Sequence, residues 1–319
     1  MLSLNKPNHT MNSNLSPINH NPYRRKFITQ LSALAGTAAL LSAPFAADAI
    51  TLTKPDEHIT VGQIIDLFMK QVPGAPFPNT VDTLKSGNRD IVVTGIVTTM
   101  FATIGIIEKA ISLGANFIIA HEPTFYNHAD ETTWLANDDV FQYKKQLLDK
   151  HNIAVWRNHD TIHSLKPDGI GIGLLKQLDW VSYYKPETGN LLTIPSISLS
   201  SLIDTLKKKL KIEKVRYIGN PSQSCQKVLL LPGAAGGKRQ ITEMSTKKPD
   251  VLICGEISEW ETAEYVRDAQ AKGDKLSLIV LGHIASEEPG SEFMIGWLKQ
   301  NVPGIKATHI HPGNSLAFM

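Results

Sequence analysis

This 319-residue sequence has very few cysteines and no apolar run long enough to cross a membrane. Its two cysteines, Cys225 and Cys254, are too few for a disulfide framework, and we expect both to be free thiols. The apolar, small-residue run 28–41 is about 14 residues long, well short of the roughly 20 that cross a bilayer. The sequence therefore predicts neither a disulfide-stapled module nor a protein held by a membrane-spanning helix.

A strong charge of one sign is also missing. The formal net charge is +2, and the first 49 residues hold four of the 32 basic residues and one of the 30 acidic residues. The remaining chain is therefore close to neutral, which predicts no nucleic-acid partner. The basic run 207–211 overlaps a predicted helix with an apolar stripe, 199–210, so its lysines are expected on a solvated helix face.

The amino-terminal residues 1–49 have the layout of an export signal. Arg24-Arg25-Lys26 precede the short apolar run, and Ala47-Asp48-Ala49 resembles a cleavage site. The paired arginines resemble a twin-arginine signal, which moves folded proteins across the bacterial inner membrane. We therefore expect a periplasmic or exported protein, with no stable membrane anchor after cleavage. An ordinary secretory signal with a chance arginine pair is the alternative.

The rest of the sequence alternates between strand and helix patterns, which is typical of an α/β fold with a largely parallel sheet. The second half repeats the rhythm of the first, so we predict two α/β lobes, 50–185 and 186–319, with parallel or mixed sheets flanked by helices. The predicted strands are 91–97, 117–120, 153–156, 215–218, 227–231, 251–254, 278–281 and 306–310. The predicted helices are 60–72, 100–113, 138–151, 199–210, 259–271 and 286–300.

Histidine or glutamate side chains follow four of these strands. His121 and Glu122 end one strand, a run from His159 to His163 ends the next, and Glu256 and His283 follow two later strands. Ligands of open α/β sheets bind outside the carboxyl ends of the strands, where loops and helix amino termini meet. His283 and Glu287 also lie at i and i+4, on one face of a helix if it begins there. The repetition predicts one shared site.

Imidazole and carboxylate groups without thiolates favour Zn, Fe, Mn, Co or Mg. The candidates exceed what one ion needs, so we predict two divalent metal ions, bridged by a carboxylate and a water that would act as the nucleophile of a hydrolase. Glu256 is the candidate catalytic proton carrier, and His159 is expected to orient a ligand. The predicted metal ligands are His121, Glu122, Asp160, His163, His283 and Glu287.

Each feature also has a purely structural explanation. His121 could bond a backbone carbonyl, Glu122 could belong to a turn, and Asp160 could cap one. The turn 233–237 is rich in glycine and could cradle a phosphate, but it lacks the Gly-Lys-Ser/Thr ending of a Walker loop and could be a tight strand-to-helix turn. His309 and His311 share a face of the last predicted strand and could be near the site or form a surface pair.

Three stretches resemble the Nif-three-like proteins, also called dinuclear-metal-centre hexamers or type 2 GTP cyclohydrolase I homologues. They are 114–123 (Gly-Ala-Asn-Phe-Ile-Ile-Ala-His-Glu-Pro), 255–258 (Gly-Glu-Ile-Ser) and 282–287 (Gly-His-Ile-Ala-Ser-Glu). The resemblance implies that His121, His283 and Glu287 are metal ligands. This chain has Glu122 where the family typically has a second histidine, and His163 where it has an aspartate, with Asp160 three positions earlier.

The resemblance implies a metal pair between two α/β lobes and a homo-hexamer built as a trimer of dimers. It also implies hydrolysis of a small-molecule substrate, with the opening of the GTP purine ring as the activity for which the family is named. The leading hypothesis is therefore an exported dinuclear metal-dependent hydrolase. The alternative is a non-catalytic, toroidal metal-binding scaffold.

Overall fold

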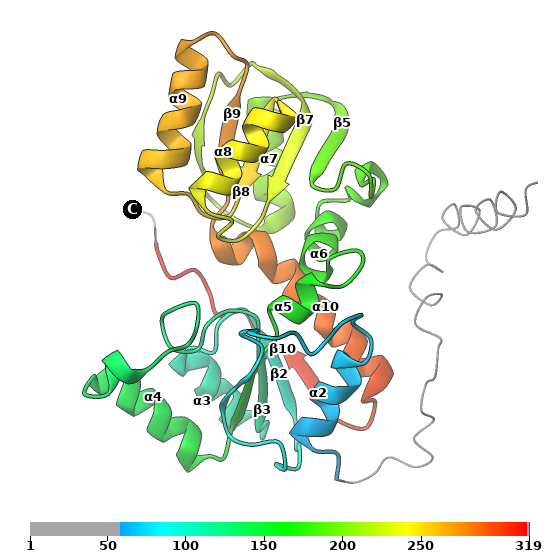
Figure 1. The fold of residues 1–319 in the computed structure, drawn as a ribbon, viewed down its shortest axis with the longest axis vertical. Helices are drawn as coiled ribbons and strands as arrows, with labels where there is room; N and C mark the ends of the chain where they lie inside the picture. The colour runs from blue at the N-terminus through cyan, green and yellow to red at the C-terminus, as the bar shows by residue number, and fades with distance from the viewer. Residues whose placement is uncertain (1–57, 318) are drawn as a thin grey trace, which may run out of the picture. The chain divides into compact units, whose positions relative to one another are not determined.

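Two five-stranded mixed sheets, each flanked by helices, organise the chain (Figure 1). The computed structural model describes residues 58–317 and 319. The predicted export segment 1–49 lies outside the described residues and stays a prediction. The α/β class with two helix-flanked sheets is confirmed. Within the described residues, no helix is both long enough and apolar enough to cross a membrane.

The first sheet has the strand order β1-β4-β3-β2-β10. Its strands β2, β3, β4 and β10 run parallel, and β1 is antiparallel to β4. Every residue of the three central strands is buried, as expected for a sheet that is covered on both faces. The strands are β1 (Leu84–Ser86), β2 (Ile96–Thr99), β3 (Phe117–Ala120), β4 (Ala154–Arg157) and β10 (Ala307–His309).

Helices cover the first sheet on both faces because alternate strand residues point to opposite sides. Helix α2 (Val61–Met69) packs on one side, and α3 (Ile104–Ser112) and α4 (Asp139–Lys150) pack on the other. The amino terminus of α2 has a capping box in which the Thr60 side chain accepts a hydrogen bond from the backbone N–H of Gln63. The short helices η1 (Thr133–Leu135) and α5 (Asp160–His163) lie in the connections.

The second sheet has the order β5-β7-β8-β9-β6, with a parallel centre and two antiparallel edge strands. Helices α6 and α7 pack on one face, and α8 and α9 pack on the other. The strands are β5 (Leu191–Ser198), β6 (Arg216–Ile218), β7 (Ser224–Leu231), β8 (Val251–Cys254) and β9 (Ser277–Val280). The helices are α6 (Gly169–Gln177), η2 (Val181–Tyr183), α7 (Leu199–Leu210), α8 (Gly237–Lys247), the π-helical turn η3 (Glu259–Ala263) and α9 (Glu264–Ala271).

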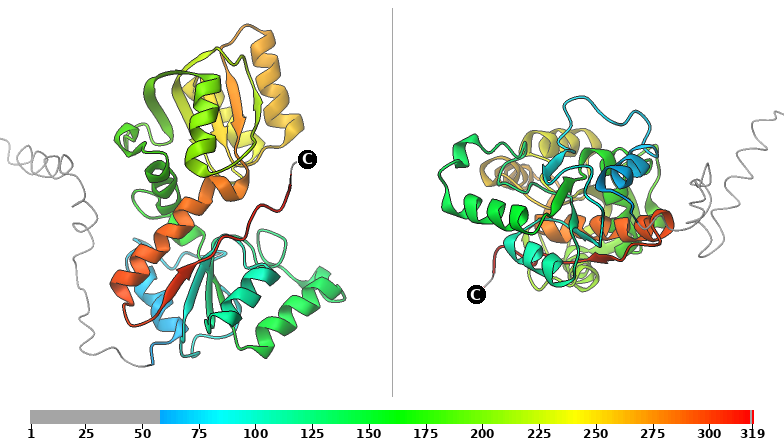
Figure 2. Two further views of the ribbon diagram at one scale, coloured as in Figure 1. Left: turned by 180° about the vertical axis from the view of Figure 1, so that it is seen from behind. Right: turned by 90° about the horizontal axis from the view of Figure 1, so that it is seen from below.

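Helix α10 (His283–Asn301) joins the two sheets. It begins three residues after β9 of the second sheet and leads into β10, which pairs with β2 of the first sheet (Figure 2). The predicted division into 50–185 and 186–319 assigned this last strand to the second lobe, whereas the strand completes the first sheet. Two segments more than 200 residues apart in the sequence thus form neighbouring strands.

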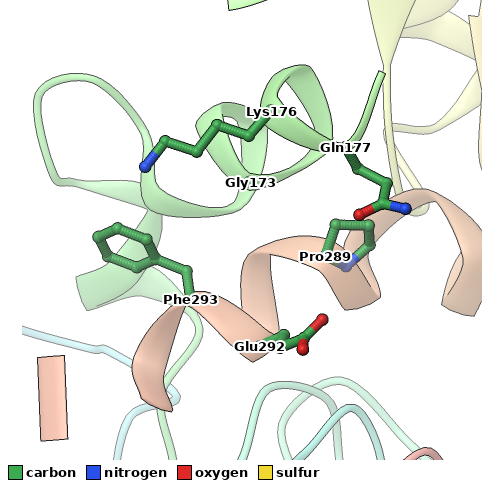
Figure 3. A pocket seen from close by; sticks show the side chains of 6 residues that line it. All are labelled: Gly173, Lys176, Gln177, Pro289, Glu292 and Phe293. Carbon is green, nitrogen blue, oxygen red and sulfur yellow. The ribbon is translucent and has the colours of Figure 1, made fainter. Parts of the chain in front are cut away.

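Helices α6 and α10 cross in close contact, and two glycines make the contact possible. A Cβ atom at Gly290 would lie 2.4 Å from the Cα of Ile170, and one at Gly173 would lie 2.4 Å from the Cα of Gly290. Figure 3 shows Gly173 of α6 facing Pro289 of α10. Because the conflict would be with backbone atoms, this crossing fixes the position of α10 closely.

Two cysteine predictions have different outcomes. Both Cys225 and Cys254 are free thiols, as expected. Burial raises the pKa of the Cys225 thiol to about 11 and that of Cys254 to about 12, so neither is a reactive thiolate near neutral pH. Cys225 lies outside the predicted strand 227–231, but it is buried within β7, because this strand begins three residues earlier than its apolar run suggested.

Candidate metal centre

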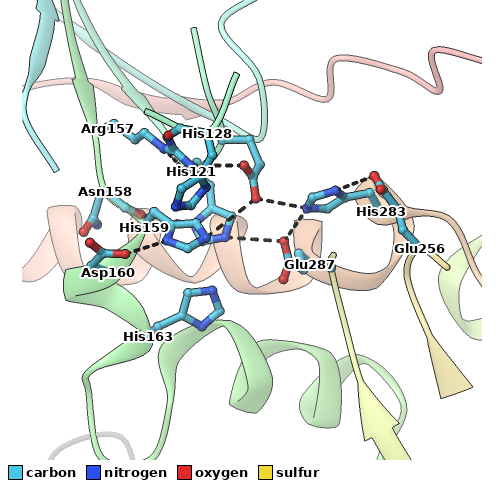
Figure 4. A network of polar contacts seen from close by, with 12 residues as sticks. His121, His128, Arg157, Asn158, His159, Asp160, His163, Glu256, His283 and Glu287 are labelled. Atoms are coloured by element: carbon cyan, nitrogen blue, oxygen red, sulfur yellow. Dashed lines mark hydrogen bonds and ion pairs between the residues drawn. The ribbon is translucent and has the colours of Figure 1, made fainter. Parts of the chain in front are cut away.

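Side chains from the ends of both sheets meet at one site (Figure 4). His121 and Glu122 follow β3, and His159 follows β4, both in the first sheet. Glu256 follows β8 of the second sheet, and His283 begins α10 directly after β9. Carboxyl ends of parallel strands share one edge of a sheet, which explains why residues so distant in sequence converge.

His121 is the most buried imidazole of this site, with an exposed fraction of 3%. Its Nδ1 donates a hydrogen bond to the backbone carbonyl of Asn158 at 3.1 Å. Its Nε2 is buried and has no hydrogen-bond partner among the described residues; the Oε2 of Glu287 lies 3.4 Å away without hydrogen-bond geometry. A buried polar atom left in this state is costly unless a ligand uses it.

His121, His159 and His163 form the first group whose donor atoms could hold one ion. In all three, Nδ1 donates to a fixed oxygen: His159 to the Asp160 carboxylate at 2.9 Å and His163 to the Asp168 carboxylate at 3.0 Å. This leaves the Nε2 lone pair of each ring for a metal, which is the usual arrangement of a histidine ligand. The ring centroids of His121 and His159 are 4.9 Å apart, and those of His121 and His163 are 5.1 Å apart.

The surroundings shift the pKa values of the two half-buried members of this group, His159 and His163, in opposite directions. Burial, together with the nearby His121, lowers the pKa of His159. Burial would also lower the pKa of His163, but the hydrogen bond to Asp168 outweighs it and the pKa is raised.

His121, Glu122 and Glu287 form a second group, which is buried throughout. Burial would raise the pKa of both carboxyl groups, but the imidazoles of His121 and His283 hold both pKa values below the usual range. Glu122 is also fixed from behind by the fully buried Arg157, whose Nη2 donates to Oε2 at 3.3 Å. Two ionised carboxylates therefore face the buried imidazole of His121.

His283 lies among three carboxylates. Its Nε2 is 3.0 Å from Oε1 of Glu122 and 2.9 Å from Oε2 of Glu287, and its Nδ1 donates to Oε1 of Glu256 at 2.8 Å. Burial alone would lower the pKa of His283, but these hydrogen bonds raise it to about 12. Glu256 is the exposed member, with 55% of its side chain accessible, and the hydrogen bond from His283 lowers its pKa.

The glycine-rich turn supports this arrangement from the second sheet. Gly233 has a left-handed backbone, with φ of 63°, and a Cβ atom there would lie 2.1 Å from Oε1 of Glu287. The N–H of Gly233 donates to Oγ of Ser286 at 2.9 Å, while Ser286 donates to the carbonyl of His283. The turn 233–237, for which a phosphate-binding role was one interpretation, therefore packs against the start of α10 and leaves room for the Glu287 carboxylate.

Asp160, one of the predicted ligands, lies outside both donor groups. Its Oδ2 accepts hydrogen bonds from Thr80 Oγ1 at 2.8 Å and from the N–H of Val81 at 3.1 Å, and its Oδ1 accepts from His159. The geometry favours the opposite of the two predicted roles: the Asp160 carboxylate holds the ring of His159, and His159 belongs to a donor group. The ligand roles of His121, Glu122, His163, His283 and Glu287 stay predictions, although the structure brings all five together.

Sequence reasoning missed three supporting residues. Arg157 donates to the carbonyl of His121 as well as to Glu122, Asp168 holds His163, and Asp82 accepts hydrogen bonds from the N–H groups of residues 159–161. Only Arg157 carried a signal, because a charged residue at the buried end of a strand needs a partner. Asp82 lies about 80 residues before its partners, and no local pattern connects them.

The family model described as Duf34/NIF3 (NGG1p interacting factor 3) matches residues 81–312, which include every residue of the site. The chain belongs to this family. Among its NIF3 relatives, a Clostridium acetobutylicum protein named GTP cyclohydrolase 1 type 2 homolog is 24% identical over 217 residues, covering 65% of this chain and 76% of that protein. A Chlamydia muridarum protein of the same name is 21% identical, covering 68% of this chain and 84% of that protein.

Solved structures share the NIF3 fold. The Bacillus cereus protein related to NIF3 has a TM-score of 0.66 at 14% identity, covering 83% of this chain and 99% of that one. The Staphylococcus aureus protein SA1388 has a TM-score of 0.63 at 17% identity, covering 82% and 98%. Identities this low show the fold alone. The side chains of this chain fit a divalent cation. Three imidazoles have Nδ1 engaged in a hydrogen bond, the buried Nε2 of His121 makes no hydrogen bond within the described residues, and two carboxylates are ionised.

Proposed function

We propose that this chain binds two divalent transition-metal cations at the site around His121 and is a metal-dependent hydrolase. The observation that carries the proposal is His121, which belongs to two donor groups and whose buried Nε2 makes no hydrogen bond within the described residues. Because one imidazole nitrogen binds one ion, His121 serves one cation. Glu122 and Glu287 would supply carboxylate oxygens for the two cations. The ligands would be His121, Glu122, His159, His163, His283 and Glu287.

A divalent ion bound there would supply Lewis acidity, polarising an oxygen of the substrate and making water a better nucleophile near neutral pH. Other residues of the chain hold the ligands in position. Asp160 and Asp168 hold Nδ1 of His159 and His163, and Arg157 keeps Glu122 in place from the buried side. Glu256 holds Nδ1 of His283 and is the most exposed carboxylate of the cluster, so it is the group best placed to exchange a proton with substrate or solvent.

The names of the relatives suggest one substrate to test first. Several are called GTP cyclohydrolase 1 type 2 homologs, so hydrolytic opening of the GTP purine ring is a candidate reaction. Phosphoesters and cyclic amides are the other classes that a hydrolase with this donor set would accept. An exported protein would meet little GTP, which favours these two classes if the signal is functional.

Metal analysis of the purified full chain tests the binding step. We expect bound divalent ions in the wild type, and loss of most of that metal in His121→Ala and His283→Ala. His151→Ala is the matched control, because His151 is exposed at the end of α4 and far from the site in sequence. Equal metal content in all four proteins, with the fold intact by circular dichroism, would refute the metal site.

Turnover assays test the catalytic step. The metal-loaded protein should hydrolyse at least one of GTP, phosphoesters or cyclic amides. Glu256→Gln, which keeps an oxygen acceptor for Nδ1 of His283, should slow turnover at saturating metal by about 10²–10⁴-fold, the usual contribution of a proton carrier. A fully loaded protein that hydrolyses none of them would support the non-catalytic scaffold instead.

Two further proposals concern the whole protein. We propose that residues 1–49 direct export through a twin-arginine route, supported by Arg24-Arg25 ahead of the short apolar run. Replacing both arginines by lysine should trap the precursor inside the cell, and unchanged export would refute that route. We also propose a homo-hexamer, by resemblance, which light scattering of the purified protein tests directly.

A further inference from the structure

A second cluster of metal-ligand side chains lies outside the site described above. It consists of Glu288 on α10, His309 on β10, and His311 two residues beyond that strand. Oε1 of Glu288 accepts a hydrogen bond from Nε2 of His309 at 2.9 Å, and Oε2 lies 3.0 Å from Nδ1 of His311. The two rings stand nearly perpendicular, with centroids 5.0 Å apart. One carboxylate therefore holds two imidazoles around a common point.

Burial makes this arrangement a stronger candidate than a surface ion pair. The side chains of Glu288 and His309 are 9% and 7% exposed, whereas 68% of the His311 side chain is accessible. A buried carboxylate needs a compensating positive charge, and a divalent cation held between Glu288 and the two imidazoles would supply it.

A hydroxyl group next to His309 can form a hydrogen bond with either tautomer of the imidazole ring. Thr98 on β2 is fully buried, and its Oγ1 lies 2.9 Å from Nδ1 of His309. A hydroxyl both donates and accepts. It can donate to Nδ1 while Nε2–H bonds Glu288, or accept from Nδ1–H once Nε2 coordinates an ion. The tautomer required of a ligand is thus available without rearrangement.

We propose that Glu288, His309 and His311 form a separate site for one divalent cation of the zinc class. Two imidazoles and one carboxylate favour Zn²⁺, Co²⁺ or Ni²⁺ over Mg²⁺ or Ca²⁺, which prefer oxygen ligands. The donor atoms lie within 4.8 Å of one another, close enough for an ion with ligand distances of about 2.0–2.2 Å after small side-chain shifts. Glu287 serves the first site and Glu288 the second, because neighbouring helix residues point about 100° apart.

The site has an open side. A cavity of about 490 Å³ is lined by Glu288 and His311, together with residues of α10 and the chain beyond β10. Gln177, Pro289 and Glu292 line both this cavity and the neighbouring hollow drawn in Figure 3. Three protein ligands leave at least one coordination position, which water or a small ligand entering the cavity would complete.

The bound cation would tie the carboxyl-terminal segment to α10. His309 and His311 flank the end of β10, and Glu288 lies in the second turn of the helix that also carries His283 and Glu287. The ion would therefore hold the last strand of the first sheet against the helix that positions the first site.

Zinc titration of the full chain, stripped by chelator, tests this proposal. The background is a His121→Ala/His283→Ala double variant, which disables the first site, so that failure of the first site cannot be mistaken for failure of this one. In that background we expect one Zn²⁺ per chain by calorimetry, and an absorption spectrum typical of low-coordinate Co²⁺ when Co²⁺ replaces it. Adding His311→Ala should abolish the Co²⁺ spectrum and weaken Zn²⁺ by more than about tenfold.

Three further variants sharpen the test. His311 is largely exposed, so its replacement opens no core cavity and the fold should persist. Thr98→Val keeps the shape of a buried side chain and removes the partner of His309, which should weaken Zn²⁺ by about 10–100-fold. His151→Ala should change nothing. If His311→Ala and Glu288→Gln both bind Zn²⁺ as the background protein does, the cluster is only a hydrogen-bonded anchor and the proposal is wrong.

Discussion

The imidazole of His283 brings a positive charge to the carboxylates of the first site. Its hydrogen bonds to Glu122, Glu256 and Glu287 outweigh the effect of burial and raise its pKa to about 12, so the ring is protonated at neutral pH. Coordination through Nε2 requires that this proton leave, because a metal ligand must be a neutral imidazole. The same carboxylates thus stabilise the imidazolium and would also stabilise a bound ion.

Gly233 provides a residue-scale test of how Glu287 is held. Gly233→Ala should weaken metal binding by more than about tenfold, because its Cβ atom would lie 2.1 Å from Oε1 of Glu287 and displace the carboxylate. Gly236→Ala is the matched control: its φ is also positive, at 81°, but a Cβ there meets nothing within 4 Å. Both variants should also lose about 1–3 kcal/mol of stability, because a non-glycine residue is strained at a positive φ. Equal metal affinity in the two would contradict the packing role of Gly233.

Lys144 provides a pH-dependent prediction away from the metal ligands. Its side chain is 4% exposed and its Nζ donates to the carbonyl of Thr124. Burial lowers the pKa of Lys144 from 10.5 to about 8, although Asp130 partly opposes this. Between these two pH values the folded chain has released a proton that the unfolded chain retains, so stability rises with pH across this window.

The measurement is urea unfolding of the wild type and Lys144→Met at several pH values between 7 and 10.5. The stability of the wild type relative to the variant should increase by about 3 kcal/mol over this range, since one unit of pKa corresponds to about 1.4 kcal/mol. A difference that stays constant with pH would show that the ammonium is not destabilised by burial.

The candidate site could be predicted only in part from the sequence, because some of its contacts are local and others are not. The convergence of His121, Glu122, His283 and Glu287 could be predicted because each follows a strand or shares a helix face. The roles of His159 and Asp160 could not, because Thr80 and Val81, some 80 residues away, turn the Asp160 carboxylate out of the site. Asp168 was missed for a related reason: a proline-containing turn brings it back to His163.

At the scale of elements, the buried strands were predicted together with two of the four edge strands, β6 and β10, whereas the edge strands β1 and β5 and the helices α6 and α8 were not. The strands at 117–120 and 251–254 and the helix at 199–210 have the predicted bounds, because their burial patterns are strong. β1 was missed and β5 was not predicted, since both are partly exposed edge strands with polar residues. The pairing of β10 with β2 depends on the path of α10, which no local pattern reveals.

The crossing of α6 and α10 yields a prediction at this scale, with two glycines of one helix as its variants. Gly290→Ala should destabilise the protein by about 1–3 kcal/mol, because the added Cβ would press on the backbone of Ile170. Gly296→Ala should stabilise it by about 0.5–1 kcal/mol, because a Cβ there meets nothing within 4 Å and alanine favours the helix. Thermal or urea unfolding measures both. Equal effects of the two substitutions would contradict the close crossing.

At the scale of the whole molecule, the first site lies where both sheets meet. His121, Glu122 and His159 extend from the first sheet, whereas His283 and Glu287 begin the helix that leaves the second. Hydrogen bonds from His283 to Glu122 already cross between them. A cation held by both sets would add a link that exists only in the folded chain, so metal binding should stabilise both sheets together.

Chelation tests this link. At a free ion concentration of about 100 times Kd, binding adds about 2.7 kcal/mol, which for a chain of this size corresponds to roughly 5–10 °C in Tm. We expect EDTA to lower Tm by that amount in a single calorimetric transition, because α10 couples the two sheets. The test is best made with His311→Ala, which removes any contribution of the second cluster. The triple variant His121→Ala/His283→Ala/His311→Ala should then show a low Tm that EDTA does not change. If EDTA removes the metal and Tm stays constant, or if only one of two separate transitions moves, the ions do not join the sheets.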